Sequence, residues 1–134
     1  MKRIISTILV CVLLVGCAFT LFSCGEVNTD PFAAHGAFKD NGYVVTLRKN
    51  VGEYAATVFA DKNDLANKRY EYIEIYYFEN NEESQKAWDV RAESYLAQQE
   101  ASKGQECEIK VGHVETFIYK GTADAVKLLE KALF

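Results

Sequence analysis

The residues most able to do chemistry are few and far apart in this chain. His35 and His113 are its two histidines, and neither lies within a run of cysteines, histidines and carboxylates. A zinc site needs three or four converging ligands, so we predict no metal site and no cofactor. The serines lack a nucleophile-elbow sequence, and Gly121-Thr122 lacks the glycine-rich loop and lysine of a phosphate cradle. The sequence therefore predicts no catalytic residue.

A glutamate among tyrosines is the most unusual placement of a titratable group. Glu74 alternates with Tyr72 and Tyr76 in a segment typical of a β-strand, so the three side chains share one face. A carboxylate beside tyrosine hydroxyls can have a raised pKa or can hydrogen-bond a ligand. Tyrosine also offers rigid apolar area with a polar tip, which suits an interface. We therefore predict Tyr72, Glu74 and Tyr76 as binding residues, with ordinary sheet packing as the alternative.

The cysteines do not form an evident disulfide framework. Cys11, Cys17 and Cys24 lie in the first 24 residues, and only Cys107 lies in the body of the chain. The sequence neighbours of Cys107 are glutamates, and these do not activate a thiol. We expect a buried, unreactive Cys107; a disulfide between Cys24 and Cys107 is the alternative if processing occurs before Cys17.

Residues 1–23 have the pattern of an export signal that is removed. Lys2 and Arg3 form a short positive start, and residues 4–22 form an uncharged run rich in Ile, Leu and Val. This combination is typical of a signal peptide and not of a folded domain. The run is also just long enough to cross a bilayer, so an uncleaved single-pass membrane protein is the alternative.

A lipid-attachment sequence follows the apolar run. Residues 21–25 read Leu-Phe-Ser-Cys-Gly and resemble a bacterial lipobox, with an aliphatic residue three before the cysteine and a small residue directly before it. That resemblance implies a diacylglyceryl group, with palmitate-type chains, on Cys24. Cys17 is the alternative, since the residues before it fit the lipobox better. We prefer Cys24 because residues 24–29 are suited to a lipidated tether, whereas those after Cys17 are apolar.

The charge balance excludes one class of partner and restricts another. The chain has 134 residues and a net charge of −4, which becomes −6 once Lys2 and Arg3 leave with the signal. An acidic domain repels phosphate backbones, so we expect no nucleic-acid partner. Contact with the membrane would come from the lipid anchor, because two or more acyl chains hold a protein on a bilayer almost permanently.

Residues 30–134 have the pattern of a single domain of helices and strands. Asp30-Pro31 starts a short helix, and three strand segments are predicted over 43–48, 53–60 and 70–79. Asn80 and Glu83 form a capping-box pattern at the start of a long helix. Residues of this helix recur at the spacing of a buried stripe: Trp88, Ala92, Tyr95 and Leu96.

Two further strands and a helix complete the predicted domain. The strands cover 107–111 and 114–119, joined at Gly112-His113, and the helix follows Gly121-Thr122. The resulting order, α-β-β-β-α-β-β-α, predicts an α+β fold. We expect a mainly antiparallel sheet covered on one face by helices, for which a ferredoxin-like topology is one arrangement.

Two segments carry a resemblance to small uncharacterised bacterial lipoproteins. Residues 76–84 combine an aromatic strand, an acidic cap and the start of an amphipathic helix, and residues 118–126 are similar to the end of the same proteins. The resemblance covers residues 30–134. It implies a lipobox signal followed by one α+β domain of unknown function, and it implies no activity and no functional residue.

These features predict a lipoprotein held by its lipid at the cell membrane, facing outside the cytoplasm. We expect a non-catalytic module that binds an envelope protein or a small ligand. The alternative from another functional class is an enzyme, or an enzyme accessory, that acts on cell-envelope material. That alternative requires two of the groups His35, Glu74, Cys107 and His113 to approach within hydrogen-bonding distance.

Overall fold

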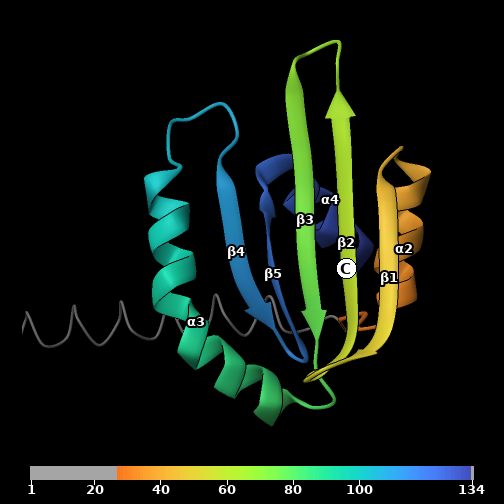
Figure 1. Ribbon diagram of the computed structural model, residues 1–134, viewed down its shortest axis with the longest axis vertical. Helices are drawn as coiled ribbons and strands as arrows, with labels where there is room; N and C mark the ends of the chain where they lie inside the picture. The colour runs from red at the N-terminus through yellow and green to blue at the C-terminus, as the bar shows by residue number, and fades with distance from the viewer. Residues whose placement is uncertain (1–26, 134) are drawn as a thin grey trace, which may run out of the picture.

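The computed structural model describes residues 27–133, in which an antiparallel five-stranded sheet carries three helices (Figure 1). The signal segment, Cys17 and Cys24 lie outside the described residues. The predicted α+β class, antiparallel sheet and element order are confirmed. The elements are α2 (Pro31–Asp40), β1 (Val44–Val51), β2 (Tyr54–Asp64), β3 (Arg69–Tyr77), α3 (Asn81–Ala101), β4 (Ile109–Val114), β5 (Phe117–Thr122) and α4 (Ala123–Leu133).

The strand β3 lies at the centre of the sheet, whose order is β1-β2-β3-β5-β4. Its two apolar faces explain this position, because a central strand is covered from both sides. The first three strands form a continuous antiparallel meander. A ferredoxin-like unit instead has a helix between its first two strands, so the whole domain does not follow that arrangement.

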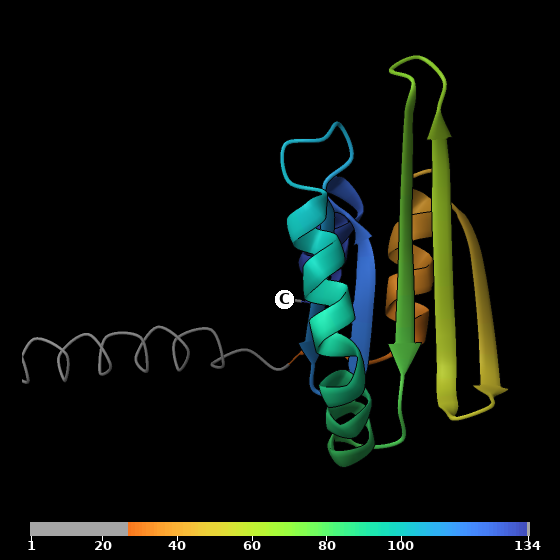
Figure 2. The ribbon, with the colours of Figure 1, turned by 60° about the vertical axis from the view of Figure 1, so that its left-hand side comes forward.

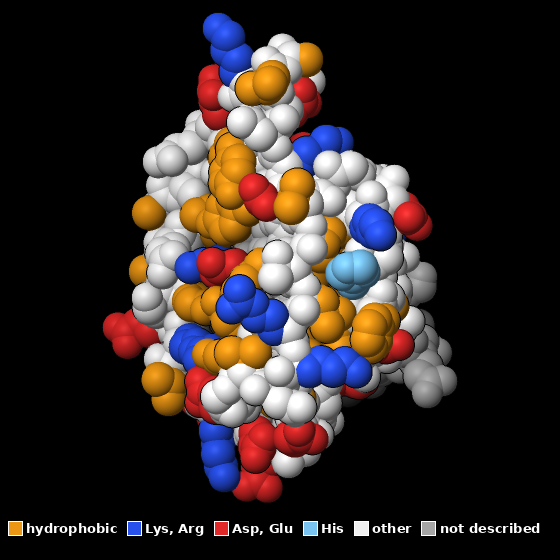
Figure 3. Space-filling model, turned by 45° about the vertical axis from the view of Figure 1, so that its right-hand side comes forward, with side chains coloured by type: hydrophobic (Ala, Val, Ile, Leu, Met, Phe, Trp, Pro, Cys, Tyr) orange, Lys and Arg blue, Asp and Glu red, His pale blue; other side chains and the backbone are white. Residues whose placement is uncertain are grey.

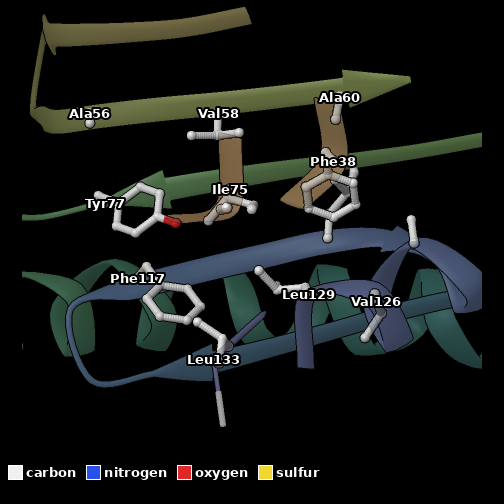
Figure 4. Packing of buried hydrophobic residues seen from close by; sticks show 13 residues of the cluster. Phe38, Ala56, Val58, Ala60, Ile75, Tyr77, Phe117, Val126, Leu129 and Leu133 are labelled. Atoms are coloured by element: carbon white, nitrogen blue, oxygen red, sulfur yellow. The ribbon is translucent and has the colours of Figure 1, made fainter. Parts of the chain in front are cut away.

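The hydrophobic core lies between one face of the sheet and the helices α2 and α4. Alternate residues of β2, β3 and β5 point toward these helices, as the period of two along a strand requires. Figure 4 shows side chains of the two layers meeting in this interior. The largest of the fully buried core side chains are Phe38, Ile73, Ile75, Phe117 and Leu129.

The helix α3 lies on the opposite face of the sheet, where it packs mainly on β4 and β5 (Figure 2). The Trp88 ring stacks on His113 of β4, and Lys120 of β5 lies over the Tyr95 ring. The prediction that helices cover one face of the sheet holds for α2 and α4. The helix α3 differs, because its aromatic side chains pack against residues of β4 and β5 that point to the other face. The expected stripe is only half-buried at Trp88 and Tyr95, and Leu96 is exposed.

Several predicted strand boundaries are wrong. The strand β1 continues to Val51 instead of ending at residue 48, and β5 covers Phe117–Thr122 instead of residues 114–119. The strand β2 continues to Asp64, because each residue from 56 to 64 has a partner on β3. Gly112 and His113 lie inside β4, and the chain turns at Glu115, whose φ of 47° is left-handed. The register explains the shift, since it places fully buried Phe117 opposite Tyr77 in the core.

The described chain is fastened to the domain from its first residues. Val27 packs against the core, and the Asn28 N–H donates to the Leu133 carbonyl oxygen at 3.3 Å. The Asp30 carboxylate accepts from the Phe32 N–H at 2.9 Å and caps α2, as the sequence predicts. Residues 27–29, which belong to the predicted tether, thus lie on the domain surface.

The two edges of the sheet are treated differently. At the β4 edge, side chains of α3 and its C-cap accept backbone hydrogen bonds: Gln99 Oε1 accepts from Val111 N–H at 3.0 Å, and Ser102 Oγ accepts from Ile109 N–H at 2.8 Å. At the β1 edge, no backbone hydrogen bond from another segment within residues 27–133 reaches the strand beyond its pairing with β2.

Candidate functional site

The three predicted binding residues share the face of β3 that points away from α2 and α4. The cross-strand register brings Phe59 of β2 and Lys120 of β5 to either side of Glu74. We name this surface the aromatic face; it consists of Phe59, Tyr72, Glu74, Tyr76 and Lys120. The alternation of the strand predicts the three β3 residues, whereas Phe59 and Lys120 depend on strand pairing.

The carboxylate of Glu74 is held between a hydroxyl and an ammonium group. Tyr76 donates to Glu74 Oε2 at 3.4 Å, and Lys120 Nζ lies 3.8 Å from the same oxygen. Lys120 is fixed in turn by Gln98 Oε1 at 3.4 Å and by the ring of Tyr95 at 5.0 Å. The polar centre of the aromatic face is therefore positioned by β3, β5 and α3 together.

The tyrosines of the aromatic face remain protonated at neutral pH. Burial raises the pKa of Tyr76 well above its ordinary value, and the negative charge of Glu74 raises it further. The pKa of Tyr72 is raised by burial and by Glu74 in the same way. Protonated hydroxyls can donate and accept hydrogen bonds, so these rings offer a ligand an apolar surface with polar tips.

An arginine on α3 closes one side of the aromatic face. The Arg91 guanidinium lies 5.4 Å from the ring of Tyr54 and 5.5 Å from that of Tyr76, in cation–π geometry. Its Nη2 donates to Glu53 at 2.8 Å, whereas its buried Nη1 has no partner within the described part of the chain. The stacked cation ties α3 to the sheet at this point.

The aromatic face is an open surface and not a deep cleft. Phe59 is 38% exposed, because α3 leaves β1, β2 and most of β3 uncovered on this side. Figure 3 shows hydrophobic side chains in a band below the protruding β2–β3 hairpin, interrupted by acidic and basic groups. A ligand here would lie across the strands, with apolar contact on both sides of a charged centre.

Surface hollows also lie elsewhere in the described chain, and two of them adjoin groups discussed above. One of about 400 Å³ is bordered by Glu53, Phe78 and the first turns of α3. The other, of about 220 Å³, is lined by Arg69, Glu71, Cys107 and neighbouring acidic residues. Within residues 27–133, no cluster of three or more histidine, cysteine or carboxylate side chains is placed to hold a metal ion.

The groups that the enzyme alternative requires are not brought together. His35 lies on α2, and the half-buried Cys107 approaches the Tyr70 carbonyl oxygen at 3.7 Å. Glu74 contacts Tyr76 and Lys120, and His113 contacts α3. No hydrogen bond joins any two of these four in the described part of the chain. Cys107 is also less buried than its sequence predicts.

One contact that the sequence does not predict joins a serine to a histidine. Ser84 Oγ, in the first turn of α3, lies 2.9 Å from His113 Nε2 on β4. The sequence separates the two residues widely, and only the return of the β4–β5 hairpin to α3 joins them. The capping-box pattern at Asn80 predicts the helix start beside Ser84, but no pattern in the sequence predicts this contact.

The geometry of this pair fits a structural clamp. Ser84 is fully buried, so a substrate has no access to its hydroxyl. The hydroxyl can donate to the carbonyl oxygens of Asn81 and Glu115, and His113 Nε2 also lies 3.0 Å from the latter. Backbone carbonyls thus satisfy the polar atoms of the pair and join α3 to the β4–β5 turn.

Comparison with protein-family models, with curated proteins and with solved structures gives no match for this chain. None of the helices in residues 27–133 is long and apolar enough to cross a membrane. The aromatic face and the N-terminal sequence are therefore the features of this chain that bear on its function.

Proposed function

We propose that this protein is a lipid-anchored binding module on the outer side of the cytoplasmic membrane. The observation that carries the binding role is the aromatic face, whose β2 side α3 leaves uncovered while α2 and α4 cover the other side of the sheet. Exposed aromatic area around a fixed ion pair is typical of surfaces that bind partners. An envelope protein or a small envelope ligand would lie across β2 and β3.

The sequence supports the anchor. The charged start, the apolar run and the lipobox resemblance favour cleavage before Cys24 and acylation of its thiol. The acidic balance of the remaining chain gives no electrostatic attraction to anionic lipids, so attachment depends on the acyl chains. Cys17 remains the competing attachment point.

The geometry favours binding over catalysis. Glu74 is paired with Lys120 and Tyr76, and Ser84 is buried in its clamp. General acid–base chemistry needs a titratable group within reach of a bound substrate, in a site that excludes water. The open aromatic face offers contact area and hydrogen bonds instead.

Intact mass of the protein from the membrane fraction tests the anchor. We expect wild type to begin at residue 24 with added acyl mass, and Cys24→Ala to lose both the cleavage and the added mass. Cys17→Ala should leave the mass of the mature protein unchanged, because residue 17 is removed with the signal. A full-length chain without acyl mass would contradict the proposal and favour the single-pass alternative.

Site-specific photo-crosslinking in cells tests the binding role. A photoreactive phenylalanine analogue at Phe59 should yield defined adducts, because this side chain is exposed on the aromatic face. The matched control is Val90, which is 83% exposed on α3. Adducts at Phe59 should disappear with Tyr76→Ala, and equal labelling at both positions would contradict the proposal.

A further inference from the structure

The attachment of Val27 and Asn28 to the domain limits how far the domain can stand from a lipidated Cys24. Val27 packs against the core, and Asn28 is bonded to the last turn of α4. Three residue steps separate Cys24 from Val27, and a fully extended chain covers at most about 11 Å over that distance. The surface around Val27 would therefore lie close to the lipid headgroups.

One corner of the sheet lies next to this attachment point. The start of α2 follows directly at Pro31, and β1 ends beside it. Phe32 is 54% exposed there, and Lys49 Nζ lies 4.6 Å from the centre of its ring. Val51, at the end of β1, is also exposed. Exposed aromatic and aliphatic side chains beside a lysine are suited to the boundary between headgroups and acyl chains.

The charges at this end of the molecule favour one part of its surface over another for contact with the membrane. Glu82 and Glu83 lie in the first turn of α3, at the same end of the molecule (Figure 1). Anionic headgroups repel these carboxylates, whereas the corner formed by Phe32, Lys49 and Val51 presents a cation beside apolar side chains. The domain therefore has a preferred edge toward the bilayer.

The opposite end of the molecule carries the β2–β3 hairpin. β2 has eleven residues, which span about 35 Å at the usual rise of a strand. The turn beyond its end holds Leu65, which is 81% exposed. When the α2 end rests on the bilayer and β2 runs away from it, this tip lies far from the headgroups.

We propose that the corner formed by Phe32, Lys49 and Val51 rests on the lipid bilayer and that the β2–β3 hairpin projects away from it. This inference rests on the lipid attachment proposed above. The partner is the headgroup region of the membrane that carries the anchor. The orientation leaves the aromatic face perpendicular to the membrane and open to partners that approach from the side.

The test places a fluorescent label on the full-length protein, expressed in bacteria and purified with its lipid. Cys107→Ser removes the thiol of the domain, and Val51→Cys or Leu65→Cys supplies one labelling site. The labelled proteins are reconstituted in vesicles of phosphatidylethanolamine and phosphatidylglycerol that contain a nitroxide-bearing quencher lipid. We expect quenching at Val51→Cys to exceed that at Leu65→Cys several-fold.

Two further variants test the corner itself. Phe32→Ser should reduce quenching at Val51→Cys several-fold, whereas Val90→Ser, on the far side of α3, should leave it unchanged. Equal quenching at both label positions, or no effect of Phe32→Ser, would overturn the orientation in a protein whose mass shows acylation at residue 24. A protein without acyl mass would overturn the anchor itself, and the two failures are told apart by that measurement.

Discussion

The hydroxyl of Tyr77 is buried in the core and has no hydrogen-bond partner within residues 27–133. Its ring packs against Phe117 at 5.2 Å between centroids, so the ring has a clear packing role and the hydroxyl does not. A buried polar atom without a partner costs about 1–3 kcal/mol. The buried hydroxyl therefore destabilises the folded state, although the ring that carries it is well packed.

Tyr77→Phe should therefore stabilise the domain. We expect the free energy of unfolding to rise by about 1 kcal/mol, because the ring stays and the unpaired hydroxyl is removed. Chemical denaturation followed by circular dichroism measures the change. Tyr70→Phe is the control, since that tyrosine is exposed and should change the free energy by less than about 0.5 kcal/mol. A destabilised Tyr77→Phe variant would show that the hydroxyl has a partner.

At the scale of elements, the close pairing of β3 and β5 depends on a residue without a side chain. A Cβ at Gly121 would lie 2.6 Å from the Tyr72 carbonyl oxygen and 2.9 Å from the Ile73 Cα. Backbone atoms of a central strand cannot move aside cheaply. Gly36, on α2, has no atom within 4 Å of the corresponding position.

Substitution of these two glycines by alanine should have opposite effects. Gly121→Ala should lower the free energy of unfolding by about 1–3 kcal/mol through overpacking. Gly36→Ala should raise it by about 0.5–1 kcal/mol, because alanine is the better helix former. Thermal and urea denaturation measure both. Similar changes of the same sign would mean that the β3–β5 spacing adapts.

The clamp at Ser84 is the second element-scale feature with a measurable effect. Ser84→Ala removes the hydroxyl that joins α3 to the β4–β5 turn. We expect a loss of about 1 kcal/mol in unfolding free energy and faster amide exchange in the first turns of α3. Ser94→Ala, on the exposed side of the same helix, should change neither by much. Equal effects of the two would contradict a clamp.

The elements that local chemistry determines could be predicted from the sequence. Asp30 and Asn80 cap their helices as expected, and the alternation around Ile73 and Ile75 predicts a central strand. The predictions that are wrong depend on contacts between segments far apart in the sequence. The register of β5 against β3 sets where β4 ends, and no local signal at Gly112 reports that register. The exposed Leu96 fits helical spacing, but the sheet does not extend beneath it.

The candidate site shows the same division. The period of a strand places Tyr72, Glu74 and Tyr76 on one face, and this much could be predicted. Lys120 and Phe59 complete the aromatic face through pairing with two other strands, and Ser84 meets His113 only through a returning hairpin. Such contacts between distant segments have no signature in a single sequence.

At the scale of the whole molecule, several tyrosines share one pH response. Burial, with the charges of Glu71 and Asp124, raises the pKa of Tyr43 to about 12. The pKa values of Tyr76 and Tyr77 are also raised, mainly by burial. Above about pH 10 the unfolded chain loses these protons first, so the unfolded state is favoured as the pH rises.

Below about pH 10, these tyrosines should not change the free energy of unfolding with pH. Between about pH 10 and pH 12, their ionisation in the unfolded chain should lower it. Urea denaturation over a series of alkaline pH values measures this decline. Tyr76→Phe removes one of the raised groups and should make the decline less steep. A stability that rises with pH in this range would contradict the assignment.

The unequal edges of the sheet limit how this domain can assemble. Gln99 and Ser102 occupy two backbone donors of β4, so within residues 27–133 β1 is the edge more open to an added strand. Each copy can then pair with one other copy through β1, and this pairing leaves no open β1 edge on either copy. Strand addition through β1 would therefore end at a closed pair and would not propagate into a fibre.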